Sequence, residues 1–126
     1  MKLPRQEDIE IYVRDCAVEE LEGWIESSFS PLGRPDRFGD TLVYPSSLGP
    51  VTLTNVGGPF VGIWFATPRS PWATDVDCAR QAATELKRVV RCDPGRHSPE
   101  VDPQSDVFLE IDDGVERLVE WHDEDD

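Results

Sequence analysis

The feature that most constrains this chain is a run of 28 residues, 41–68, that contains no charged side chain. Charged residues make up 30% of the whole protein, so charge is unevenly distributed along the sequence. Prolines and glycines, among them Pro45, Pro50 and Gly57-Gly58-Pro59, divide the run into short pieces. Because a membrane-spanning helix needs about 20 uninterrupted apolar residues, the run predicts short strands joined by turns and no transmembrane segment.

Three β-rich pieces of this run predict neighbouring antiparallel strands, at residues 41–44, 51–56 and 60–67. In the third piece Val61, Ile63 and Phe65 share one face under the two-residue period of a strand. Trp64 points to the opposite face. Both faces are then apolar, so we place this strand in the centre of the sheet or with one face offered to a partner.

The four tryptophans divide into two pairs by their positions in the sequence. We expect Trp24, in an amphipathic helical segment, and Trp64, in the apolar strand, to pack in the core. Trp72 follows a proline outside any predicted element, and Trp121 lies beside the acidic end of the chain. We expect these two side chains to be partly exposed.

Helical spacing flanks the uncharged run on both sides. Apolar residues recur every three or four positions in segments 16–28 and 75–92, which predicts two helices. Thr74 is placed to cap the second helix, and we expect Lys87, Arg88 and Arg91 to lie in its last two turns. Residues 30–40, rich in proline and glycine, predict a loop.

Strand signals occur at both ends of the chain. Ile9, Ile11 and Val13 alternate with polar residues, as in a half-buried strand. Near the other end, segments 107–111 and 116–121 flank the tripeptide Asp112-Asp113-Gly114. Asp-Gly tolerates the positive φ angles of tight hairpin turns, so this pattern predicts a β-hairpin.

The resulting element order, β-α-β-β-β-α-β-β, predicts an α+β fold in which two helices pack on one face of a mostly antiparallel sheet. We expect residues 1–122 to form a single domain and residues 123–126 to form an acidic tail. A domain of this length buries enough surface to fold without metals or disulfides.

Net charge limits the kinds of partner. The formal charge is −14, and segment 98–126 holds twelve acidic residues against the single Arg117. Such a protein is repelled by nucleic-acid backbones and by anionic lipid, so we expect neither as a partner. Segment 67–97, with six basic and four acidic residues, is the one basic region.

Cysteine and histidine usage gives little support for catalysis or metal binding. Three cysteines without a CxxC pair indicate a reducing compartment, and we expect a cytoplasmic protein. Cys16 lies at a predicted helix start, but neighbouring carboxylates favour its neutral thiol. Cys92, Asp93 and His97 do not supply a preorganised zinc site. We predict packing roles for the thiols, no metal site and no cofactor.

One basic constellation is a candidate anion-binding site. Arg69 precedes the second predicted helix, and Thr74 lies at its start. Free backbone N–H groups at a helix N-terminus attract anions. Capping by Thr74 and a surface position for Arg69 explain the same residues without a ligand.

The function that these features favour is binding of a basic protein. An acidic surface accelerates encounter with such a partner, and aromatic side chains supply affinity. Immunity and inhibitor proteins that neutralise a toxin or nuclease have this character. The predicted contact residues cluster at the carboxyl-terminal hairpin: Glu110, Asp112, Asp113, Glu116, Glu120 and Trp121.

Two alternatives belong to other classes. The first is an enzyme or small-ligand-binding domain with a pocket beside the uncharged strands, in which Arg69 contacts an anion. No catalytic motif supports it. The second is a homodimer or larger assembly formed through the uncharged strands.

Overall fold

The computed structural model describes residues 8–95, 100–102 and 105–121. The predicted acidic tail, 123–126, and both histidines, His97 and His122, lie outside these residues. The elements follow in the order β1 (Ile9–Arg14), α1 (Val18–Ser28), β2 (Asp36–Phe38), β3 (Thr41–Tyr44), β4 (Val51–Asn55), β5 (Phe60–Phe65), α2 (Asp75–Leu86), β6 (Val90–Cys92), β7 (Val107–Asp112) and β8 (Val115–Glu120). No helix within the described residues is long and apolar enough to cross a membrane.

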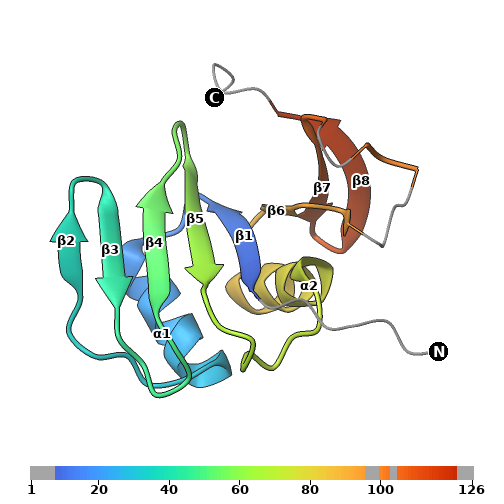
Figure 1. Cartoon of the computed structure of the whole chain (residues 1–126). Coiled ribbons are helices and arrows are strands. Elements are labelled where there is room, and N and C mark those ends of the chain that lie inside the picture. Colours follow the sequence, from blue (N-terminus) through green and yellow to red (C-terminus); the bar gives the residue numbers. More distant parts are fainter. Residues whose placement is uncertain (1–7, 96–99, 103–104, 122–126) are drawn as a thin grey trace.

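The predicted α+β class is confirmed. The strands form one antiparallel sheet in the order β2-β3-β4-β5-β1-β6-β7-β8. Strand β5 lies between β4 and β1, where Ile63 is opposite both Leu53 and Ile11. The central position predicted for the uncharged strand 60–67 is therefore correct (Figure 1).

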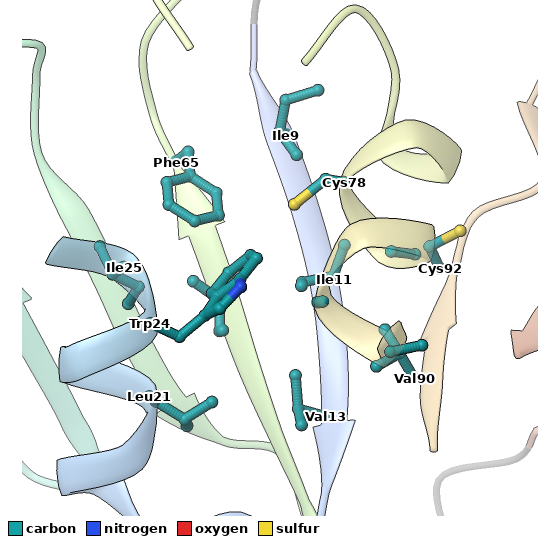
Figure 2. Packing of buried hydrophobic residues seen from close by; sticks show 14 of the residues in the cluster. Ile9, Ile11, Val13, Leu21, Trp24, Ile25, Phe65, Cys78, Val90 and Cys92 are labelled. Carbon is teal, nitrogen blue, oxygen red and sulfur yellow. The ribbon is translucent and has the colours of Figure 1, made fainter. Parts of the chain in front are cut away.

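Both helices pack on the same face of the sheet. Ile9, Ile11 and Val13 lie on that face of β1 and are fully buried. Figure 2 shows them between Trp24 of α1 and Cys78 of α2. Neither of the two described helices covers the opposite face, and we call it the open face.

Two short strands occur where the sequence predicted other structure. Strand β2 lies in the predicted loop 30–40 and pairs with β3 across Gly39-Asp40. Strand β6 occupies the predicted end of the second helix, because α2 stops at Leu86 and Lys87 adopts the left-handed conformation with φ 57°. The prediction of a helix to residue 92 was wrong.

The three cations expected in the last helical turns therefore lie beyond the helix. Arg88 still satisfies its carboxyl end, since the guanidinium donates hydrogen bonds to the carbonyls of Leu86 and Lys87. Arg91 lies in β6, where it is opposite Tyr12 of β1 and Glu110 of β7. A helical repeat of valines and a short buried strand look alike in sequence, and pairing on both sides favours the strand.

Two tryptophan predictions were wrong in opposite senses. Trp72 is only 4% exposed and stacks on Trp24, with ring centroids 5.6 Å apart. Trp64 is 43% exposed, because it points to the open face of β5. The expectations that Trp24 is buried and Trp121 partly exposed are confirmed.

Asp75, the first residue of α2, forms a hydrogen bond to β1 beyond the part of that strand that pairs with β6. Its carboxylate accepts a 3.0 Å hydrogen bond from the backbone N–H of Glu10. Glu10 lies two residues before Tyr12, which pairs with Arg91 of β6. Burial, with smaller contributions from Asp93 and Glu10, raises the pKa of Asp75 to about 7. The native state therefore disfavours the ionised carboxylate.

Replacing Asp75 with asparagine is expected to stabilise the protein at pH 8 by a few kcal/mol. The folded pKa is above the ordinary value of 3.8, so the stability that Asp75 contributes is present below pH 4 and is lost as the pH rises through 7. Since one pKa unit corresponds to about 1.4 kcal/mol, the effect is at most roughly 4 kcal/mol. Urea unfolding of both proteins at pH 4 and pH 8 measures it. A stability difference that is the same at both pH values would contradict this account.

Candidate functional site

The hairpin of β7 and β8 forms the end of the sheet beyond α2 (Figure 1). Asp112 pairs with Val115, so the turn consists of Asp113 and Gly114. Both have positive φ angles, 51° and 82°, as required by the tight turn that best matches strand twist. The predicted Asp-Gly hairpin is therefore confirmed.

Glu110, a predicted contact residue, is 3% exposed and lies inside an ion-pair network. Its carboxylate accepts hydrogen bonds from Arg91 of β6 at 2.9 Å and from Arg117 of β8 at 2.8 Å. Burial acts to raise the pKa of Glu110, but the hydrogen bonds from the two arginines outweigh it and lower the pKa. Glu110 thus joins three strands, and we leave it out of the candidate contact surface.

Trp121, the predicted aromatic contact, is half-buried against the open face. Its ring centroid lies 4.8 Å from Phe60, 5.1 Å from Tyr12 and 5.2 Å from Phe108. The Arg91 guanidinium lies 5.1 Å from the same ring. Trp121 therefore packs the end of β8 against β1 and β5. This packing accounts for its half-buried position without a bound partner.

Glu116 faces the helix side of the sheet and binds α2. Its two carboxylate oxygens accept hydrogen bonds from Arg80 Nε at 2.7 Å and Nη2 at 3.0 Å. The pair is partly open to solvent, because 43% of the Arg80 side chain is exposed. Glu116 is thus accessible to a partner, but its charge is already paired.

Asp112, Asp113 and Glu120 are exposed to solvent, as the sequence-based prediction requires of contact residues. Leu118 lies between Glu116 and Glu120 on the same face of β8 and is 42% exposed. We call these five residues the hairpin patch. They combine carboxylates with one accessible apolar side chain.

Sequence reasoning missed Leu118. An apolar residue in a predicted strand is expected to face a core, and its partner across the hairpin, Leu109, does so. Leu118 remains exposed because β8 is the last strand of the sheet. The alternation Glu116-Leu118-Glu120 is the sequence signal that could have identified this face.

The two residues of the predicted anion site have separate local roles. The Arg69 guanidinium donates a 3.2 Å hydrogen bond to the carbonyl of Ser47. Thr74 caps α2, and its hydroxyl accepts the backbone N–H of Asp77 at 3.2 Å. Among the described residues no contact joins Arg69 to Thr74, so each follows the simpler explanation considered above.

A surface pocket of about 760 Å³ lies at the carboxyl-terminal end of α2, away from the position predicted for a ligand pocket beside the uncharged strands. It is bordered by the end of β1 and by the hairpin turn. Its lining brings together charges of both signs: Arg14, Asp15, Lys87, Arg88, Asp112 and Asp113. Arg69 does not line it.

The three thiols are buried and are not paired in disulfides. Burial, the largest cause, raises the pKa of Cys16, Cys78 and Cys92 above the ordinary value, so each favours the neutral form. Cys78 of α2 and Cys92 of β6 both belong to the buried core (Figure 2). Within the described part of the chain, no group of three histidine, cysteine or acidic side chains is placed to hold a metal ion.

Comparisons of the chain with protein-family models, with curated proteins and with solved structures find no match. The hairpin, the open face and their charges are therefore the features that bear on function.

Proposed function

We propose that this protein is a small cytoplasmic binding protein that neutralises a basic protein partner, as an immunity or inhibitor protein neutralises a toxin or nuclease. The observation that carries the proposal is the hairpin patch. Glu116 and Glu120 flank an accessible leucine on one face of β8, and Asp112 and Asp113 add exposed carboxylates at the adjoining turn. This combination suits a partner that is drawn in by charge and held by apolar contact.

Two carboxylates of the patch, Asp112 and Asp113, differ from Glu110 and Glu20 in having no ion pair with a described residue. Glu110 is held by two arginines, and Glu20 pairs with Arg88 at 3.2 Å. Asp112 and Asp113 form no ion pair with any described residue. Their charges are therefore available for long-range attraction, which raises association rates with basic proteins.

Strand β8 has features that oppose extension of the sheet by another strand. Three of its residues, Glu116, Arg117 and Glu120, are charged, and charged edge strands resist edge-to-edge pairing. Binding through side chains is thus favoured over a dimer built by β8 pairing. The free thiols, which a reducing compartment preserves, support the cytoplasmic part of the proposal.

Removal of three charges from the patch is expected to abolish partner capture. The variant Asp112→Asn/Asp113→Asn/Glu120→Gln retains Glu116 and its link to α2, and asparagine tolerates the positive φ of residue 113. Wild-type and variant proteins are immobilised, exposed to host lysate at low salt and washed with rising salt. A basic protein should elute from the wild type and be depleted at least tenfold from the variant.

A control variant changes the net charge by the same amount as the patch variant does. The variant Glu19→Gln/Asp36→Asn/Asp40→Asn also removes three exposed carboxylates, but from α1 and from the β2–β3 hairpin at the opposite edge of the sheet. It should capture the same protein as the wild type does. Equal depletion by both variants would show that net charge alone matters and would contradict a role for the patch.

A further inference from the structure

An exposed tryptophan with a fixed orientation lies on the open face. The Trp64 indole N–H donates a 2.9 Å hydrogen bond to the carboxylate of Asp8. This bond limits rotation of a ring that is 43% exposed, so little side-chain entropy is lost when a partner covers it. Tryptophan is also among the residues most enriched in binding hot spots.

The open face is apolar where β5 continues from Trp64 to Gly62. On the same face of β5, Gly62 is opposite Tyr12 of β1. A Cβ atom at Gly62 would lie 3.3 Å from the Val56 side chain and 3.4 Å from the Tyr12 ring, so these two side chains already close over the glycine. Val56 is itself exposed. Gly62, Tyr12 and Val56 therefore extend the apolar surface of Trp64, while Thr52 of β4 lies opposite Trp64 on its other side.

Negative charge borders Trp64 on the side of β1. Glu10 is directly opposite Trp64 in the strand register, and Asp8 holds the indole. Within the described residues neither carboxylate has an ion-pair partner, whereas Arg91 and Arg117 of the open face are bound to Glu110. Burial, and then repulsion by Asp8, raise the pKa of Glu10, while a hydrogen bond with Tyr12 opposes them.

We propose that this part of the open face is a second contact for the basic partner, which places an arginine side chain over Trp64 between Asp8 and Glu10. A guanidinium stacks on an indole and binds carboxylates at the same time. The inference rests on the proposed function, because it assigns a second site for the same class of partner. A second copy of this chain fits less well, because each copy carries a net charge of −14 and the carboxylates of the two copies would repel each other.

Nuclear magnetic resonance with a defined probe tests this contact. A tetra-arginine peptide with blocked ends is titrated into ¹⁵N-labelled protein, and the four tryptophan indole signals are followed after assignment with Trp64→Phe. The Trp64 signal should shift saturably, and those of the buried Trp24 and Trp72 should not. The Glu10→Gln variant should weaken the apparent affinity at Trp64 at least threefold, and a tetra-citrulline peptide of the same shape should cause no shift.

The same spectra separate this inference from the proposed function. Shifts confined to backbone amides of β8 would overturn the Trp64 contact and would still support binding at the hairpin patch. Shifts at Trp64 without any at β8 would support the Trp64 contact and would contradict binding at the hairpin patch. A Trp64 signal that moves with protein concentration alone would assign the face to a second copy and overturn the inference. An equal response to tetra-citrulline would also overturn it.

Discussion

Replacement of Trp72 with alanine is expected to lower the free energy of unfolding by about 3–5 kcal/mol, the usual cost of truncating a large buried aromatic side chain. Trp72 stacks nearly parallel to Trp24 and Phe29 and lies 4.9 Å from Phe65. Its indole N–H also donates a 2.8 Å hydrogen bond to Gln81 of α2. The substitution therefore removes a contact between the loop before α2, helix α1 and the central strand β5.

Chemical denaturation monitored by circular dichroism measures this loss. The control is Phe38→Ala, which truncates an aromatic ring that is 66% exposed at the β2 edge and should change stability by less than about 0.5 kcal/mol. A Trp72→Ala protein that unfolds within about 1 kcal/mol of the wild type would show that the aromatic stack is not a core element.

The second large effect is expected for Glu110→Gln, which should destabilise the protein by about 2–4 kcal/mol. Removing one partner of a buried ion pair leaves the other charges uncompensated, at a cost of roughly 3–5 kcal/mol when all are buried. Arg91 is largely buried, but two-thirds of the Arg117 side chain is exposed, and this reduces the expected cost. Glu116→Gln, which breaks a more exposed pair with Arg80, should cost less than about 1 kcal/mol.

The effect of Glu110→Gln should depend on pH. The pKa of Glu110 is lowered in the native state, so its contribution to stability is present above the ordinary value of 4.5 and is lost as the pH falls through the lower, folded value. Denaturation at pH 7 and at pH 3 should therefore show a smaller difference between wild type and variant at the acidic pH. A difference that grows on acidification would contradict the ion-pair network.

The sequence was sufficient to predict the helices, the antiparallel sheet and the Asp-Gly hairpin, because each has a local signal in spacing or turn chemistry. It did not show which face of β5 would be covered, since Val61, Ile63 and Phe65 on one side and Trp64 on the other are all apolar. The positions of α1 and α2 decide that question, and they are set by tertiary packing. Tertiary packing also explains why Trp64 is exposed and Trp72 is buried, the opposite of what was predicted for each.

The contact residues were predictable in part. Exposure of Asp113 follows from its place in the turn, and Asp112 is exposed at the end of β7 next to it. Burial of Glu110 could not be predicted, because the arginines that bind it come from β6 and β8 and meet only when β7 lies between them. Strand β6 itself was predicted as helix, so Arg91 was expected in the wrong element.

The dependence of association rate on salt is the most direct test of binding through the hairpin patch. Stopped-flow mixing with the basic protein recovered by capture should give a rate constant that falls about tenfold or more as the Debye length shrinks from about 30 Å at 0.01 M salt to about 10 Å at 0.1 M and less above it. The variant Asp112→Asn/Asp113→Asn/Glu120→Gln should associate more slowly at low salt and approach the wild-type rate at high salt, with little change in dissociation. Association rates that ignore both salt and the three substitutions would contradict the proposed function of the patch.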